Sequence, residues 1–245
     1  KAIEPLFEAK SDFQIYKTLC EKLGYGEFWD ITEEDFIAQY VGGDAAKAMG
    51  VTFDALKNDK AARLLPGDPY VSFEGGTFAT ATGRARLYQD VVTPDYNSGQ
   101  TIDESKEVEP YWEPAREADE ASEARKAHPF HLISDHHRSR THSQWGDVAY
   151  LKEIYPEPVV KINPDDAAEL GVIEGDIVRL SNDRGYVVMK AALHAGNPRG
   201  VISATRGWSA WEFVDGHFAS LPSKEFNQVC ANQAFNDVAV SIEKA

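Results

Sequence analysis

Short apolar runs separated by turn residues are the feature that most limits how the second half of this chain can fold. Residues 175–193, GDIVRLSNDRGYVVMKAAL, hold two such runs around a turn at Asn182 to Gly185, a pattern typical of a β-hairpin. Similar runs occur at residues 129–134, 156–162, 200–208 and 237–242. Many short strands with one or two helical turns between them favour a compact mixed β-barrel over a parallel doubly wound sheet.

One short helix is predicted within this strand-rich half, at NPDDAAELG. Asn163 is a suitable N-cap, Pro164 fits the first helical position, and Gly171 is a typical residue at a helix end. We expect the apolar side of this helix to pack on the barrel. Its two aspartates, Asp165 and Asp166, are expected to be first-turn charges rather than a catalytic acid pair.

The first half of the chain has helical periodicity instead. Ser11 and Thr32 precede apolar residues at helical spacing, and glycines follow these two segments, so both have recognisable starts and ends. Helices are predicted at residues 11–24, 32–43, 45–49 and 53–58.

Composition and turn residues divide the chain into three parts. Residues 70–90 predict short strands with a tight turn at Thr82 and Gly83. Residues 101–126 contain nine acids, four bases, two prolines and few aliphatic residues, which predicts an exposed, extended linker. We therefore expect an α+β, mostly β chain. Its predicted parts are a helical and β-hairpin segment at 1–100, the acidic linker at 101–127, and a barrel domain at 128–245.

Charge and cysteine content exclude several classes of function. The formal net charge is -15, whereas a nucleic-acid-binding protein needs a basic face to displace counterions. Cys20 and Cys230 are the two cysteines and form no Cys-x-x-Cys motif, which argues against a thiolate-based zinc site or iron–sulfur cluster in this chain. No apolar run approaches membrane-spanning length, so direct membrane insertion is not expected.

The stretch HLISDHHRSRTHSQW, residues 131–145, concentrates polar and cationic side chains directly after a predicted strand. It holds four of the seven histidines together with two arginines. A metal site, a phosphate-binding loop and a solvated loop are all compatible with this composition. His136 and His142 lack the His-x-x-x-His spacing of a helical zinc site. Arginine forks suit phosphate oxygens, and imidazoles can donate to ring nitrogens or oxygens.

Several motifs, taken in order, resemble the C-terminal part of the molybdopterin oxidoreductases, the dimethyl sulfoxide reductase family. The motifs are EPLFEAKSDFQIYKTLCEKLG, GTFATATGRARLY, EPYWEPAREA, HLISDHHRSRTHSQW, INPDDAAELGVIEGDIVRLSNDRG and GNPRGVISATRGWSAW. The resemblance covers nearly the whole chain. It implies that the last domain is a double-psi β-barrel. It also implies a bound molybdopterin guanine dinucleotide carrying molybdenum or tungsten.

The resemblance also assigns residues to the cofactor. The family pattern in the loop after the first barrel strand corresponds here to His136, Arg138, His142, Ser143 and Gln144. The same assignment extends to Arg140 and His137 within the loop and to Trp208, Asn227 and Gln228 further along the chain. The family often has proline at the position of His137. Trp208 and Trp211 are core or rim aromatics by default, with Trp208 also a candidate platform for the cofactor.

In the family, the metal-ligating residue and the iron–sulfur cysteines lie upstream of this region. We therefore assign no catalytic and no metal-ligating residue to this chain, and expect an iron–sulfur cluster only upstream of it. The chain begins at Lys1, and we expect it to be a piece of a longer polypeptide that is not catalytically competent alone. The partners that the resemblance implies are upstream domains and an iron–sulfur electron-transfer subunit.

The reaction that the resemblance implies is two-electron chemistry at the metal, such as oxygen-atom transfer. The compartment is left open by the sequence, with a bacterial or archaeal periplasm favoured over the cytoplasm. The alternative function is a non-catalytic double-psi barrel that serves as a binding or adaptor module. The helical first half and the Thr-x-x-Gly-Arg motif at residues 80–84 count against this alternative, because a bare barrel module would not carry them.

Overall fold

A computed structural model describes residues 3–59, 69–90, 92, 103, 105–224, 227, 229 and 232–245. The chain divides into two compact units, Lys1–Ala85 and Arg86–Ala245, which we call unit one and unit two and describe separately. Among the described residues, no helix has the length and apolar character needed to cross a membrane.

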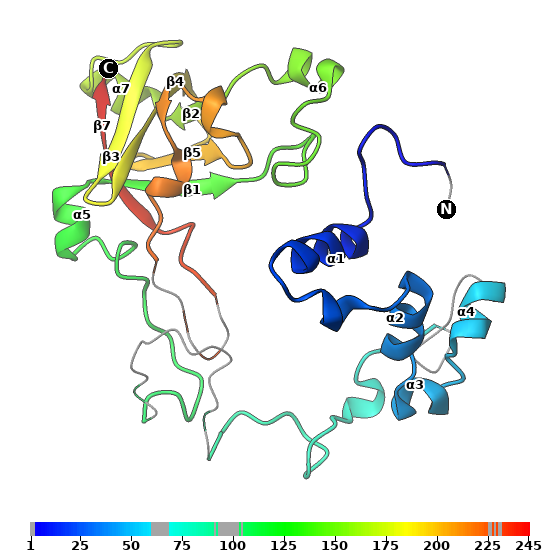
Figure 1. The fold of residues 1–245 in the computed structure, drawn as a ribbon. Coiled ribbons are helices and arrows are strands. Elements are labelled where there is room, and N and C mark those ends of the chain that lie inside the picture. Colours follow the sequence, from blue (N-terminus) through cyan, green and yellow to red (C-terminus); the bar gives the residue numbers. More distant parts are fainter. Residues whose placement is uncertain are drawn as a thin grey trace. The chain divides into compact units, whose positions relative to one another are not determined.

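Unit two contains a closed barrel of six strands (Figure 1). The strands of the sheet are β1 (Phe130–Asp135), β2 (Val159–Ile162), β3 (Ile177–Asn182), β4 (Gly185–Leu193), β5 (Val201–Thr205), β6 (Asp215–Gly216) and β7 (Val238–Lys244). Their order is β2-β5-β1-β7-β3-β4, and β2 pairs with β4 to close the ring, while β6 is added to β4. The β1–β5 and β2–β4 pairs are parallel and the other pairs of the ring are antiparallel. This is the expected double-psi β-barrel.

Alternating side chains from the six strands fill the interior of the barrel. In β3, Val178 and Leu180 are completely buried, and their neighbours along the strand are only partly buried. Leu132 of β1 and Ile202 of β5 are also completely buried and belong to the same core. Burying one such side chain contributes roughly 1.5–3 kcal/mol. The period of two along each strand therefore determines which face points inward.

Helix α7 (Pro164–Glu169) forms where the sequence predicts it, with the Asn163 side chain accepting a hydrogen bond from Asp165 N at 2.9 Å. The expectation for the two aspartates is correct for Asp165, which is exposed. It is incomplete for Asp166, which is only 5% exposed. Asp166 accepts hydrogen bonds from Arg199 Nε at 2.9 Å and from Gly200 N at 2.7 Å. These bonds attach the helix to the connection between β4 and β5.

Unit one is helical, as predicted. Its elements are α1 (Asp12–Lys22), a 3-10 helix η1 (Gly26–Trp29), α2 (Glu33–Tyr40), α3 (Asp44–Ala48), α4 (Phe53–Asp59) and a 3-10 turn η2 (Glu74–Gly76). Ser11 accepts a hydrogen bond from Gln14 N at the start of α1. Thr32 and Asp35 form a reciprocal capping box at the start of α2. Local capping therefore determined both starts.

The strands predicted at residues 70–90 are not found among the described residues of that segment. The turn itself is present, since Gly83 N donates to Thr80 O at 3.0 Å and Gly83 has a φ of +68°. Phe78 N also donates to Gly83 O at 3.1 Å. A two-stranded hairpin is marginally stable without further strands or a packing surface. Neither is provided by the described part of unit one, so the turn forms without a ladder.

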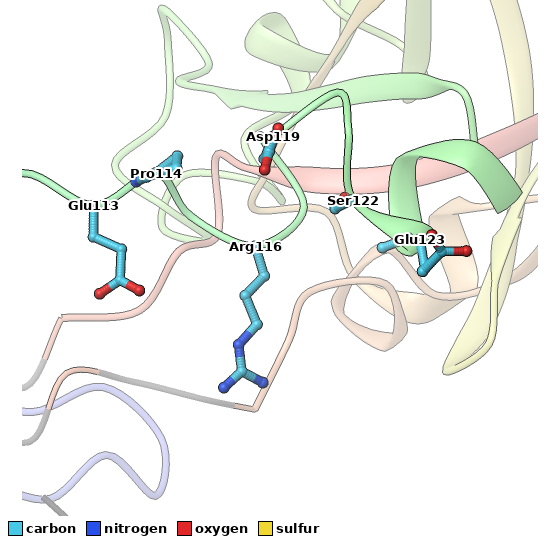
Figure 2. Close-up of a pocket in the computed structure, with 7 residues that line it drawn as sticks. Glu113, Pro114, Arg116, Asp119, Ser122 and Glu123 are labelled. Carbon is cyan, nitrogen blue, oxygen red and sulfur yellow. The ribbon is translucent and has the colours of Figure 1, made fainter. Parts of the chain in front are cut away.

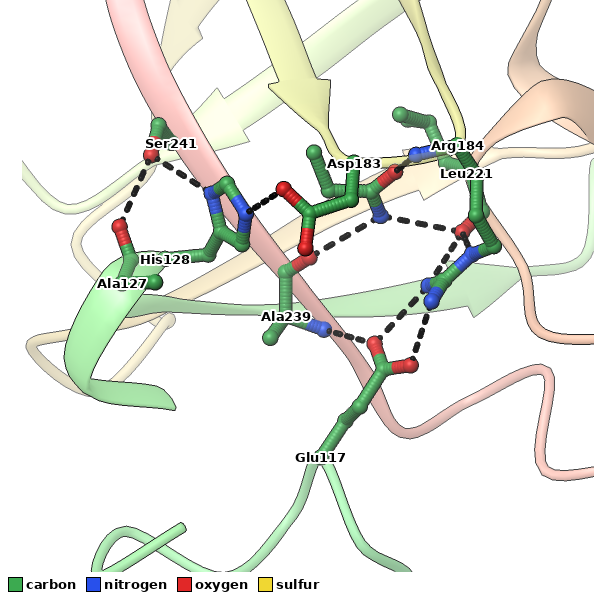
Figure 3. Close-up of polar contacts among 9 residues, drawn as sticks. Glu117, Ala127, His128, Asp183, Arg184, Leu221, Ala239 and Ser241 are labelled. Atoms are coloured by element: carbon green, nitrogen blue, oxygen red, sulfur yellow. Dashed lines mark hydrogen bonds and ion pairs between the residues drawn. The ribbon is translucent and has the colours of Figure 1, made fainter. Parts of the chain in front are cut away.

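The acidic segment before the barrel is attached to the barrel through Glu117. Most of its described side chains are exposed, as expected for a linker, but the Glu117 side chain is only 13% exposed. Glu117 accepts a hydrogen bond from Ala239 N at 2.8 Å and pairs with Arg184 at 2.8 Å (Figure 3). His128 then contacts Ser241 Oγ at 3.0 Å. The boundaries at residues 100 and 127 stay predictions.

Candidate functional site

The loop after β1 and the loop after β5 meet at the same end of the barrel. The two strands are parallel neighbours, with Asp135 in register with Thr205. Parallel neighbours end at the same edge of a sheet, so residues that follow Asp135 lie beside those that follow Thr205. The first loop runs over residues 136–148 to α6 (Ala149–Ile154), and the second leads through Trp208 to a 3-10 turn, η3 (Ala210–Glu212).

Three cationic or polar side chains form what we call the exposed cluster: His136, His142 and Arg206. The ring centroids of His136 and His142 are 5.3 Å apart. The guanidinium of Arg206 reaches across from the second loop and contacts His136 Nε2. Both histidines are exposed and Arg206 is partly buried, so the cluster is open to a ligand on the side of the histidines. Arg206 was not among the predicted site residues, although its place directly after a strand could have indicated it.

The same two loops also carry what we call the buried cluster: His137, Arg140 and Trp208. Their exposed fractions are 7%, 8% and 6%. The guanidinium carbon of Arg140 is 3.9 Å from the centroid of the Trp208 ring, a cation–π arrangement. The His137 ring is 5.7 Å from the Trp208 ring and 4.2 Å from the ring of Tyr155. The structure brings these three predicted residues together and separates them from the exposed cluster, while their contact with the cofactor stays a prediction.

The protonation state of His137 follows from its surroundings. Burial lowers the pKa of its imidazole, and the nearby Arg140 charge lowers that pKa further. Its Nδ1 accepts a hydrogen bond from Ser139 N at 3.2 Å, so the neutral ring carries its proton on Nε2. That Nε2 is buried and has no hydrogen-bond partner in the described part of the chain. His137 thus presents one buried donor without an acceptor.

Gly207 allows the two loops to touch. Its φ is +97°, and a Cβ added there would overlap the carbonyl oxygen of His142. A residue with a side chain would push the loops apart at this point. His142 also has a positive φ, of 54°, which is uncommon for a residue other than glycine. The close approach of the two backbones thus holds His142 beside the second loop.

Buried polar atoms without a partner are concentrated at this end of the barrel. Eight such side-chain atoms occur among the described residues, and six of them belong to Ser134, Asp135, His137, Arg140, Arg206 and Trp208. Buried polar groups in proteins nearly always have a partner. Four of these six atoms are N–H donors on histidine, arginine and tryptophan. This end of the barrel is therefore chemically suited to a ligand rich in acceptor atoms, such as phosphate or a nitrogen-rich ring.

The other predicted residues have less constrained positions. Arg138, Ser143 and Gln144 are exposed on the first loop. Asn227 is exposed, and its Oδ1 accepts a hydrogen bond from Val229 N at 2.8 Å. Gln228 lies outside the described residues. Trp211 is 83% exposed, so it belongs to the surface rather than to the core. Among the described residues, no group of three or more histidine, cysteine or carboxylate side chains could hold a metal ion.

A hollow lies elsewhere in unit two, in the segment that precedes β1 (Figure 2). Its lining residues are Glu113, Pro114, Arg116, Asp119, Ser122, Glu123 and Ala124. None of these residues carries a buried polar atom without a partner. Three of them are acids, which do not suit an anionic ligand. The two loops, not this hollow, therefore form the candidate site.

Comparisons with known proteins identify the family of the barrel and relatives of the chain. Residues 130–243 match the family described as Molydopterin dinucleotide binding domain. A Halobacterium salinarum protein, described as a candidate catalytic subunit of a dimethyl sulfoxide reductase, is 33% identical over 252 residues, which cover 100% of this chain and 28% of that protein. The dimethyl sulfoxide/trimethylamine N-oxide reductase of Rhodobacter capsulatus is 31% identical over 229 residues, covering 84% of this chain and 26% of that protein.

A solved structure, acetylene hydratase from Pelobacter acetylenicus, has the same fold. It matches with a TM-score of 0.67 at 19% identity and covers 99% of this chain and 34% of that chain. Fold and family match together define unit two as a molybdopterin dinucleotide-binding double-psi β-barrel. The chain belongs to the molybdopterin oxidoreductases of the dimethyl sulfoxide reductase family. It spans 28% and 26% of the length of the two curated relatives described above.

Proposed function

We propose that this chain forms one wall of the binding site for molybdopterin guanine dinucleotide in an oxidoreductase that reduces S-oxides or N-oxides. The observation that carries the proposal is the group of buried polar atoms without partners, four of them N–H donors, at the end of β1 and β5. Six polar atoms at this end of the barrel have no partner within the described part of the chain, which supports a partner that a bound ligand would supply. The named relatives act on dimethyl sulfoxide or trimethylamine N-oxide, which supports the substrate class.

Different side chains bind different parts of the dinucleotide. Arg206 and Arg138 provide charge for the pyrophosphate of the dinucleotide, because guanidinium groups bind phosphate oxygens through paired hydrogen bonds. His136 and His142 provide donors or acceptors for the pterin ring. The net charge of the whole chain is -15. A cationic loop in such an acidic protein focuses an anionic ligand at one place.

When bound, the metal of the cofactor would supply two-electron chemistry, which we propose to be oxygen-atom transfer with molybdenum rather than tungsten. The residues of this chain bind and orient the cofactor and contribute no group to the reacting atoms. We further propose that other domains of the same polypeptide complete the site and that an iron–sulfur subunit supplies the electrons.

The proposal is tested by titrating the 245-residue chain with the oxidised, metal-free dinucleotide, whose aromatic pterin is fluorescent. We expect weak binding, because one wall of a site forfeits many of the contacts of a closed pocket. Replacing His142 with alanine should raise the Kd by about tenfold, since a lost hydrogen bond costs roughly 1–3 kcal/mol.

The matched control is His194→Ala, because His194 is exposed and follows β4, outside both loops. It should leave the Kd unchanged. The proposed function fails if the wild-type chain does not bind the probe, or if His142→Ala and His194→Ala bind it equally well. Molybdenum content and turnover of S-oxides, measured in the enzyme with all its domains, then test the substrate class.

A further inference from the structure

The carboxylate of Glu212 connects the second loop to the buried cluster. Its Oε2 accepts a hydrogen bond from Ser209 N at 2.8 Å, which caps the 3-10 turn η3. Its Oε1 lies 3.6 Å from an Nη of Arg140 and 3.9 Å from Lys152 Nζ. The Glu212 side chain is 13% exposed. One carboxylate therefore contacts the first loop, the second loop and α6 at once.

The carboxylate of Glu212 provides the counter-charge for the buried guanidinium of Arg140. The Arg140 side chain is only 2% exposed, and Glu212 is its ion-pair partner in the described part of the chain. A buried cation without a counter-charge is strongly unfavourable. Without Glu212, the guanidinium would move toward water and would take its part of the first loop with it.

Arg140 in turn holds the segment that presents His142. Its guanidinium packs on Trp208 at 3.9 Å. It also lies against the backbone at Gly146, where an added Cβ would be 3.0 Å from Nη1. His142 lies between Arg140 and Gly146 in the sequence. The position of Arg140 therefore fixes where the tight turn from Thr141 to Gln144, which carries His142, lies at the end of the barrel.

We propose that Glu212 is a positioning residue for the cofactor loop, acting through the charge that it provides to Arg140. This inference rests on the proposed function, because it gives a role to a side chain that would not contact the cofactor. A second role of Glu212, the cap at Ser209, is separable from the first. Glutamine retains an oxygen that can accept the Ser209 N–H bond but removes the negative charge.

The test compares Glu212→Gln with Glu174→Gln. Glu174 is a suitable control because its carboxylate also accepts a backbone N–H bond, from Leu193, but its place before β3 is outside both loops. In the 245-residue chain without ligand, amides of residues 137–146 should exchange about tenfold faster in Glu212→Gln. The control should leave these rates unchanged.

The second measurement is the Kd for the oxidised dinucleotide. Glu212→Gln should raise this Kd by about tenfold. In a chain in which Arg140 is already replaced by glutamine, Glu212→Gln should change the Kd little, because Glu212 acts through Arg140. Unchanged exchange and unchanged Kd in Glu212→Gln would overturn the inference. So would a rise in Kd of equal size in the presence and absence of Arg140.

The two hypotheses fail in different ways. If His142→Ala weakens binding and Glu212→Gln does not, the proposed function stands and the positioning role is wrong. If the wild-type chain does not bind the probe, the proposed function fails, while the exchange rates without ligand still decide the positioning role. If Glu212→Gln does not fold, Glu212→Asp is measured instead. Because it retains the charge, exchange of the loop should stay within about threefold of wild type, and faster exchange overturns the inference.

Discussion

His137 lies against Trp208 and Tyr155, and burial lowers the pKa of its imidazole, with the Arg140 charge adding to the effect. The folded chain therefore disfavours the imidazolium, whereas the imidazole of the unfolded chain takes up a proton near its ordinary pKa of about 6.5. The contribution of neutral His137 to the free energy of unfolding is therefore fully present above about pH 6.5. It is lost as the pH falls from there toward the lowered pKa of the folded state.

This sign gives the first prediction. His137→Phe keeps an aromatic ring between Tyr155 and Trp208 but removes the titration. The free energy of unfolding should therefore fall less between about pH 7.5 and about pH 5.5 than in the wild type. Urea denaturation at both pH values measures the difference. The same substitution at the exposed His194 should retain the wild-type pH dependence, and an identical pH dependence in His137→Phe would contradict the prediction.

The close contact at Gly207 should contribute to the free energy of unfolding. An added Cβ would overlap the carbonyl oxygen of His142, whereas a Cβ at Gly200, which also has a positive φ, would meet nothing within 4 Å. Gly200→Ala should cost roughly 1–2 kcal/mol from backbone strain alone. Gly207→Ala should cost about 1–3 kcal/mol more, because the loops must separate. Equal losses of unfolding free energy in the two variants would show that the loops do not depend on this contact.

At the scale of elements, α7 is attached to the barrel through Asp166. The carboxylate holds Arg199 and Gly200 N, so the helix and the β4–β5 connection depend on each other. Asp166→Ala leaves a backbone N–H without its acceptor and should cost roughly 1–3 kcal/mol. Asp165→Ala, in the same helical turn but exposed, should cost about 0.5 kcal/mol. Thermal or urea unfolding compares the two, and equal costs would mean that Asp166 acts only as a first-turn charge.

Elements with local signals formed where the sequence predicts them. The caps at Ser11 and Thr32 and the turn at Asn182 each involve residues close together in the chain. The turn at Gly83 formed for the same reason, but its predicted strands did not, because a ladder needs a further packing surface that residues 70–90 do not contain. Local chemistry thus determines turns and helix starts, and packing determines whether strands pair.

At the scale of the molecule, the two units differ in how much core they contain. Val51 is the only buried hydrophobic side chain among the described residues of unit one. The barrel, in contrast, has a continuous core. Phe7, Phe28 and Tyr40 of unit one are 102%, 72% and 85% exposed. Apolar side chains exposed in such numbers are typical of a surface that packs against another part of a protein.

This contrast gives the last prediction. In the 245-residue chain, backbone amides of unit one should exchange with solvent orders of magnitude faster than those of β1, β3 and β7, because a segment with few buried contacts opens easily. Hydrogen exchange followed by mass spectrometry measures both units in one sample. Comparable protection of the two units would contradict the prediction and show that unit one has a stable fold by itself.

The sequence by itself determined the mostly β character of the second half, the capped helices, and the loop of histidines and arginines after β1. These features depend on neighbouring residues or on a period of two or 3.6 along the chain. The order of its motifs also identified the family, which the comparisons confirm.

Only the tertiary structure decided which residues share the site. Arg206 lies beside His136 because β5 pairs with β1, and the two residues are 70 positions apart in the chain. Burial of His137 and Arg140, and the contact of Glu212 with Arg140, likewise follow from how the loops close over the end of the barrel. Such contacts depend on strand pairing between distant segments, and no local pattern in the sequence specifies that pairing.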